Sequence, residues 1–191
     1  MQKVPHTLLS IFDASPEQAH FESPIVTKKA RALGKAIGHA GLGVIFRLGP
    51  AVVGHILAAL EPMSVTKIVL SPASNRHEHE KAYRLPLLSI PVVYSGRGAL
   101  PTDTMALNSS GGVIIFGSHK GTLENILECI KESRLPIGVL TDEDTPSIHE
   151  RVRTVAPHLT AELHVSHDPD VLVKELSHEL RRLMLEEKLA Q

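Results

Sequence analysis

Short apolar runs rich in β-branched residues alternate with longer segments of helical pattern along most of the chain. The runs are continuous rather than alternating with polar residues, which is typical of parallel strands covered on both faces. Regular alternation of strand and helix predicts right-handed crossovers and a Rossmann-like α/β fold, a doubly wound parallel sheet with helices on both faces. Seven strands are expected, at residues 7–12, 43–48, 66–71, 91–94, 112–116, 136–140 and 162–165.

The sequence contains residues that predict where several helices begin and end. Ser23-Pro24 predicts an N-cap and a first-turn proline, and Gly41 predicts the end of the same helix. Asp168-Pro169 predicts the start of the last helix, whose charged tail is expected to be solvated. No internal repeat or linker of domain length interrupts the pattern, so residues 1–191 are expected to form a single Rossmann-like nucleotide-binding domain.

Composition narrows the classes of partner. The 20 Lys and Arg residues balance 21 Asp and Glu, which argues against a nucleic-acid binder that neutralises phosphates. No apolar run approaches the roughly 20 residues that span a bilayer, so no membrane partner is expected. The single cysteine, Cys129, excludes an internal disulfide and is expected to be a core or near-core residue. The sequence therefore predicts a cytoplasmic domain without a cofactor.

In a doubly wound sheet, ligands bind outside the carboxyl ends of the strands, so we expect the ligand-binding residues at the strand-to-helix junctions. At residues 112–125, a buried strand leads through small residues into a helix that starts near Thr122. Backbone N–H groups here, with Ser118 and Lys120, would form a phosphate cradle that Gly121 lets a ligand approach. Thr122 would then cap the helix or donate to phosphate. The alternative is an ordinary turn, because the Walker motif is absent.

The junction after the second strand contains Arg47, Gly49 and Pro50. Gly49 suits a tight turn, and Pro50 suits the first position of the following helix. Arg47 would pair with a phosphate or with a surface carboxylate, and the surface ion pair is the favoured interpretation.

Two further junctions contain groups of possible metal ligands. His77 and His79 stand two residues apart and would point to different helix faces, so a solvated polar turn is favoured over a metal site. After the sixth strand, Thr145 is expected to cap the next helix, with the acids at 142–144 favouring its N-terminus rather than binding Mg²⁺. No metal site is expected.

The order of several short segments along residues 7–185 is similar to the order found in a known superfamily. They lie at residues 11–15, 70–75, 83–86, 113–117, 121–123, 135–140 and 165–169. This order is similar to that of the "Lonely guy" superfamily of Rossmann-like nucleotide-binding proteins. Characterised members cleave the N-glycosidic bond of nucleoside 5′-monophosphates. They use a P-G-G-x-G-T-x-x-E loop and an upstream arginine.

Laid onto this chain, the family motif is only partly present. Gly121 and Thr122 match its G-T, whereas Gly117, Ser118 and His119 replace its P-G-G region. Side chains at loop positions that are glycine in the family restrict the positive φ angles and the close approach that a phosphate requires.

The residues of the family's chemistry are also displaced. The acid of the motif falls on Asn125, with Glu124 one residue early, and one residue rotates a helical side chain by about 100°. The upstream arginine falls near residues 102–103, and the nearest arginine is Arg97. Arg47 occupies a position that is usually glycine. Because an asparagine cannot supply a negative charge or a base, these departures favour loss of the hydrolase activity.

Three functions remain open. The first is a binding protein for a nucleotide or sugar phosphate without the usual hydrolase activity. The second is an active nucleoside-monophosphate phosphoribohydrolase in which Glu124 and Arg97 supply the catalytic acid and cation. The third is a non-catalytic structural or interaction subunit, with Arg47 and His119 filling the cleft. The resemblance also implies a homodimer, and the helix expected at 50–60 is apolar almost all round. The expected phosphate- or nucleotide-binding residues are Gly49, Pro50, Gly117, Ser118, Lys120, Gly121, Thr122 and Asn125.

Overall fold

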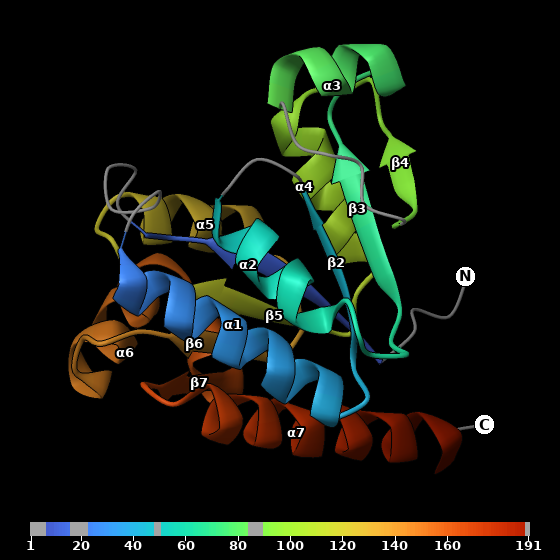
Figure 1. The fold of residues 1–191 in the computed structure, drawn as a ribbon. Coiled ribbons are helices and arrows are strands. Elements are labelled where there is room, and N and C mark those ends of the chain that lie inside the picture. Colours follow the sequence, from blue (N-terminus) through green and yellow to red (C-terminus); the bar gives the residue numbers. More distant parts are fainter. Residues whose placement is uncertain (1–6, 16–22, 48–50, 84–89, 190–191) are drawn as a thin grey trace.

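A computed structural model describes residues 7–15, 23–47, 51–83 and 90–189 (Figure 1). Seven parallel strands form one sheet in the order β4-β3-β2-β1-β5-β6-β7. The Rossmann-like α/β class and all seven expected strands are confirmed. The strands are β1 (Leu8–Asp13), β2 (Gly43–Arg47), β3 (Lys67–Ser71), β4 (Val92–Tyr94), β5 (Gly112–Phe116), β6 (Ile137–Leu140) and β7 (Leu163–Ser166).

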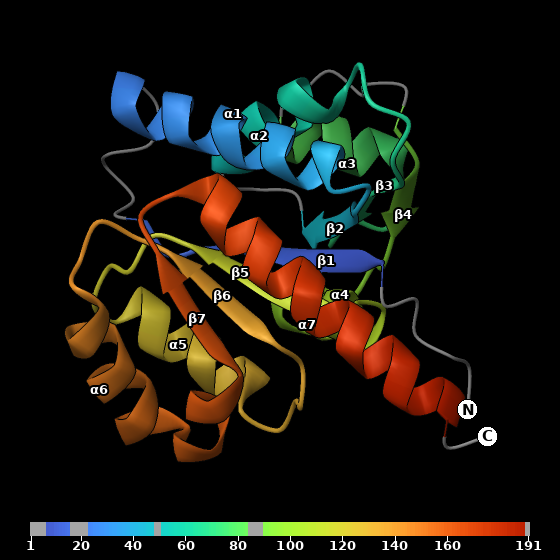
Figure 2. The ribbon, with the colours of Figure 1, turned by 90° about the horizontal axis from the view of Figure 1, so that it is seen from below.

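Helices cover both faces of the sheet (Figures 1 and 2). One face packs against α1, α2 and α7, and the other against α4, α5 and α6. Among the described helices, none combines the length and the hydropathy needed to cross a membrane. The helices are α1 (Pro24–His39), α2 (Ala51–Leu60), α3 (Arg76–Tyr83), α4 (Ala99–Asn108), α5 (Thr122–Ile130), α6 (Thr145–Val155) and α7 (Pro169–Leu189), with a 3₁₀ helix, η2, at Pro157–Glu162.

The pleat of the central strands divides their side chains between two apolar layers. In β1, Leu9 and Ile11 join the layer under α1, α2 and α7, whereas Phe12 joins the layer under α5 and α6. Ile114 and Ile115 of β5 divide in the same way. Because both faces are buried, every position of these strands favours an apolar residue, which explains the continuous apolar runs in the sequence.

The order of the strands reverses between β1 and β5. At this point the two strand ends are tied together: Ala14 N–H donates to Phe116 O, and His119 N–H donates to Ala14 O, each at 2.7 Å. Gly117 has a φ of +85°, and a Cβ there would lie 3.0 Å from the backbone of Ala14. Only glycine fits this close crossing, which fixes the crevice where such sheets bind ligands.

The helix ends agree with the sequence in part. Ser23 caps α1 by accepting from Val26 N–H, and Asp168 accepts from the first N–H groups of α7, as expected. Thr145 was the expected cap of α6, and this is wrong. Asp144 is the N-cap and accepts from Ser147 N–H at 2.9 Å, because its carboxylate is the stronger acceptor at the positive end of a helix.

The segment expected to be a solvated polar turn instead forms α3 and buries His79. Its Nδ1 lies 2.7 Å from Ser71 Oγ, and its ring packs edge-on against Tyr94, with 6.0 Å between the ring centres. Burial lowers the pKa of His79, while the nearby Glu80 opposes the shift. The expectation is corrected because the hydroxyl at the end of β3 provides a partner for a buried imidazole.

Candidate ligand-binding site

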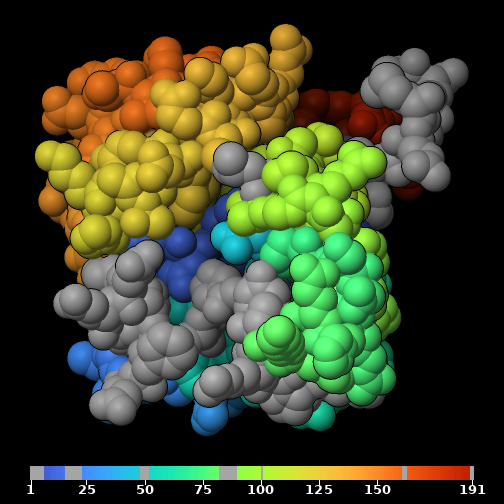
Figure 3. Space-filling view, turned by 90° about the horizontal axis from the view of Figure 1, so that it is seen from above, coloured from blue at the N-terminus to red at the C-terminus, as the bar shows by residue number. Residues whose placement is uncertain are grey.

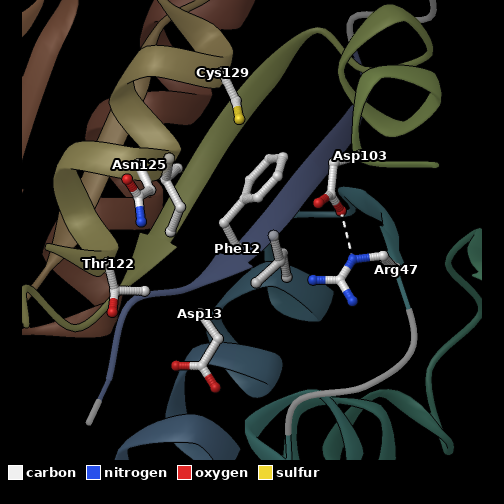
Figure 4. Close-up of a pocket in the computed structure, with 9 residues that line it drawn as sticks. Phe12, Asp13, Arg47, Asp103, Thr122, Asn125 and Cys129 are labelled. Carbon is white, nitrogen blue, oxygen red and sulfur yellow. Dashed lines mark hydrogen bonds and ion pairs between the residues drawn. The ribbon is translucent and has the colours of Figure 1, made fainter. Parts of the chain in front are cut away.

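A cavity of about 190 Å³ opens beside the carboxyl ends of β1 and β2, at the switch in strand order. In the space-filling view, the blue end of β1 and the cyan end of β2 appear in a hollow between the yellow α5 and the yellow-green α4 (Figure 3). We call this the central cavity. Its lining residues are Ile11, Phe12, Asp13, Arg47, Asp103, Thr122, Asn125, Ile126 and Cys129 (Figure 4).

An ion pair forms one wall of the central cavity. Arg47, at the end of β2, donates from Nε to Asp103 Oδ1 on α4 at 2.8 Å. The two side chains are 30% and 16% exposed. Burial raises the pKa of Asp103, while the charge and hydrogen bond of Arg47 oppose the rise. The sequence favours a surface ion pair for Arg47, but the structure places this pair in the wall of the central cavity.

The opposite wall is the start of α5 (Figure 4). Gly121, with a φ of +85°, is the N-cap, and its N–H donates to the Glu124 carboxylate. The expectation that Thr122 caps the helix is therefore wrong, because Glu124 reaches back to the start of its own helix and leaves Thr122 as the first helical residue. Thr122 and Asn125, three residues apart, both face the central cavity.

Glu124 faces a different set of groups. Its Oε1 accepts from Arg151 Nε at 2.9 Å, and Arg151 Nη1 also donates to Ser118 O at 2.8 Å and to Glu143 Oε2 at 3.0 Å. Ser118 Oγ donates to Glu143 Oε1 at 2.8 Å. We call Ser118, Glu124, Glu143 and Arg151 the α5–α6 cluster. Burial alone would raise the pKa of Glu124, but the hydrogen bonds from Arg151 and Gly121 outweigh it and lower that pKa.

The structure divides the expected binding residues between two cavities. Thr122 and Asn125 line the central cavity, whereas Gly117 and Ser118 line a second cavity of about 400 Å³ beside the start of α1. Lys29 also lines the second cavity and is paired with an acidic residue, Asp142, of the β6–α6 loop. The β5–α5 loop therefore does not present all its expected binding groups to one space.

Four expected site residues line neither of these two cavities: Lys120, Gly121, Glu124 and Arg97. Lys120 and Arg97 are exposed, and the N–H of Arg97 donates to Ser95 Oγ at 3.4 Å. Gly49 and Pro50 lie outside the described residues. The catalytic roles of Glu124 and Arg97 stay a prediction.

Sequence reasoning missed Asp103 and misplaced Cys129. α5 buries Leu123, Leu127 and Ile130, so Cys129 falls beside this apolar stripe and is exposed in the cavity wall rather than in the core. Burial raises the pKa of the thiol, and Asp103 and Glu128 raise it further. The sequence does contain a signal for Asp103. It is an acid near the position of the arginine in the "Lonely guy" motif, and the opposite charge of Arg47 stands where that superfamily usually has glycine.

No protein-family model matches the sequence, and no curated protein matches it. Solved structures do share the fold. The molybdenum cofactor carrier protein from Chlamydomonas reinhardtii is 15% identical with a TM-score of 0.64, covering 90% of this chain and 96% of that one. The molybdenum cofactor binding protein from the phototrophic bacterium Rippkaea orientalis is 17% identical with a TM-score of 0.63, covering 97% and 99%. The structural-genomics target TM1055 is 15% identical with a TM-score of 0.66, covering 90% and 99%.

Proposed function

We propose that this protein binds a phosphorylated small molecule, of the nucleotide or sugar-phosphate class, in the central cavity and does not hydrolyse it. The observation that carries the proposal is that two neighbouring residues of α5 face different parts of the protein. Asn125 faces the cavity, and the neighbouring Glu124 is held by Arg151 and Gly121 in the α5–α6 cluster.

Binding is supported by the position and lining of the central cavity. It lies at the reversal of strand order, where doubly wound sheets bind their ligands. Thr122, the first residue of α5, lines the cavity, and the positive N-terminal end of a helix suits a phosphate. Phe12 and Ile126 supply apolar surface for a ring. Two solved structures with this fold are described as carrier or binding proteins for a cofactor, which supports carriage of an intact small molecule.

Loss of hydrolysis is supported by what stands at the positions of the family's chemistry. An amide at Asn125 neither accepts a proton as a base nor stabilises a cationic sugar by charge. Glu124 would need to break its bonds to Arg151 and Gly121 to enter the cavity. Near the family's arginine position stands Asp103, whose charge is opposite.

We further propose that the chain is a divergent relative of the "Lonely guy" superfamily and acts as a homodimer. The shared Rossmann-like fold supports the first proposal. The second comes from the family resemblance alone. Light scattering coupled to size-exclusion chromatography tests it: a mass of two chains supports the dimer, and a mass of one chain overturns it.

Thermal unfolding with a panel of ligands tests the proposed function. The panel contains nucleoside 5′-monophosphates, ADP-ribose and ribose 5-phosphate, each beside its unphosphorylated counterpart. A ligand at 100 times its Kd stabilises the folded state by about 2.7 kcal/mol, which raises the Tm measurably. We expect at least one phosphorylated compound to raise the Tm and to be recovered intact after prolonged incubation. No shift with any compound, or release of a free base, contradicts the proposal.

A further inference from the structure

We propose that the ring of the ligand carries an amino-lactam edge, the 2-amino-4-oxopyrimidine of guanine and of pterins, and that Arg47 and Asp103 read this edge. The inference rests on the proposed function, because it names the class of ring that the central cavity takes. It makes Arg47 and Asp103 the residues that determine specificity.

The first support is the hydrogen-bonding capacity that the ion pair leaves unused. The pair is joined end-on, by a single bond from Arg47 Nε to Asp103 Oδ1. A guanidinium has five N–H donors and a carboxylate has two acceptor oxygens. Within the described part of the chain, neither the Nη groups of Arg47 nor Oδ2 of Asp103 has a hydrogen-bond partner. The pair therefore presents donors directly beside an acceptor, in the wall of a cavity.

The second support is the order of these groups. A complementary ring edge must present an acceptor to Arg47 and donors to Asp103. The amino-lactam edge has a carbonyl oxygen, a ring N–H and an exocyclic NH₂ in a row. Arginine is the usual partner of the guanine carbonyl, and a carboxylate accepts from both N–H groups. Adenine presents one amino donor beside a ring-nitrogen lone pair, and this lone pair would face the carboxylate.

The third support is the balance of charge around the cavity. Among the described lining residues, Arg47 is the only lysine or arginine, and Asp103 is paired with it. Since Asp103 already neutralises Arg47, this wall offers a phosphate no uncompensated positive charge. A neutral ring edge needs none. The phosphate of the same ligand belongs at the opposite wall, at the start of α5 beside Thr122.

The fourth support is the size and shape of the cavity. Its volume of about 190 Å³ is below the range of about 300–1,000 Å³ that whole drug-sized ligands occupy. The cavity is therefore suited to one ring system, with the sugar outside it and the phosphate at the start of α5 beside Thr122. Phe12 lies between Arg47 and Asp103 on one side and Asn125 on the other, where a ring can pack against it (Figure 4).

Equilibrium titrations of the full-length protein with guanosine, adenosine and xanthosine 5′-monophosphates test the inference. We expect the guanine nucleotide to bind about 10- to 100-fold more tightly than the adenine nucleotide, and free pterin to compete with it. Asp103→Asn replaces one carboxylate acceptor by an NH₂ donor. This variant should lose at least tenfold in affinity for the guanine nucleotide and should gain affinity for the xanthine nucleotide, which has a carbonyl in place of the amino group.

The variant is chosen so that folding does not confuse the result. Its amide oxygen still accepts from Arg47 Nε, and a reversed preference between two ligands is not produced by a structural defect. Glu132→Gln, which removes an exposed carboxylate, is the matched control and should leave all affinities unchanged.

The inference is overturned, and the proposed function is left standing, if adenine nucleotide binds as tightly as guanine nucleotide or if the order of preference is unchanged in Asp103→Asn. If no nucleotide and no pterin binds while another phosphorylated compound raises the Tm, the inference alone fails. If no phosphorylated compound raises the Tm, both fail.

Discussion

The central cavity and the α5–α6 cluster are two polar regions built around one arginine each, on different sides of α5. Arg151 of the cluster has three acceptors: Glu124 Oε1, Glu143 Oε2 and the carbonyl of Ser118. Among the residues that the structure describes, Arg47 of the cavity has one, Asp103. The cluster uses most of its polar groups to join α5 to α6, although Nη2 of Arg151 is buried without a hydrogen-bond partner among the described residues. The Arg47–Asp103 pair keeps most of its hydrogen-bonding capacity unused.

This difference separates a structural site from a binding site more clearly than residue type does. Glu124, the most obvious candidate acid in the sequence, belongs to the cluster, while the amide of Asn125 faces the cavity. Both oxygens of the Glu124 carboxylate accept hydrogen bonds in the cluster, and Glu124 does not line the cavity. Four predictions sharpen or break the comparison, beginning with the largest expected effect.

Arg151→Ala should destabilise the protein by about 2 kcal/mol, because it leaves the partly buried Glu124 carboxylate and the Ser118 carbonyl without their donor. The free energy of unfolding in urea measures this effect. Arg153→Ala is the control, since Arg153 is an exposed arginine on the same helix and should change stability by less than about 0.5 kcal/mol. Equal effects of the two substitutions would show that the cluster is not structural.

Asn125→Leu should have the converse effect. The larger apolar side chain fills part of the central cavity and removes an amide, so ligand affinity should fall at least about tenfold. Stability should change little, because the site is at the surface of α5. Glu128→Leu, an exposed position on the same helix, controls for added apolar surface. Titration with the ligand that raises the Tm most measures the effect, and unchanged affinity would place the ligand elsewhere.

Cys129 reports on occupancy of the cavity, because it is the single cysteine of the chain and lies in the cavity wall. Since burial and nearby acids raise its pKa, alkylation by iodoacetamide should be slow at pH 7 and accelerate above about pH 9. Saturating ligand should slow the reaction several-fold. Mass spectrometry follows the modification over time, and a rate indifferent to ligand would count against binding in this cavity.

The smallest expected effect is on the pH dependence of the free energy of unfolding. The lowered pKa of Glu124 contributes stability above the unfolded value of about 4.3 and loses it as pH falls through the folded value. The raised pKa of Asp103 has the opposite sign, so its cost to folding is present at neutral pH and disappears as pH falls. Glu124→Gln should therefore lower stability at pH 7, and Asp103→Asn should not. Urea unfolding between pH 3.5 and 7 measures both variants, and a shared direction would contradict the assignment.

The fold could be predicted from the sequence because its signals are local and repeated. Continuous apolar runs such as Gly112–Phe116 mark buried parallel strands, and Ser23-Pro24 and Asp168-Pro169 mark helix starts. The crevice follows from the fold, since strand order determines where it opens.

The division of side chains within the site could not be predicted in the same way. Whether Glu124 faces a ligand or Arg151 depends on a residue 27 positions away on another helix. Cys129 and His79 were misjudged for a related reason. The sequence shows that a residue is small or polar, but its neighbours across the fold decide whether it lines a cavity or is buried beside a hydroxyl.

The most direct test of the account is a crystal structure of the protein soaked with the ligand that raises the Tm most. We predict an intact ligand, with its ring against Phe12 and within hydrogen-bonding distance of Arg47 and Asp103, and with its phosphate near Thr122. A cleaved ligand would contradict the proposed loss of hydrolysis. An intact ligand seated in the second cavity beside Lys29 would contradict the assignment of the central cavity as the binding site.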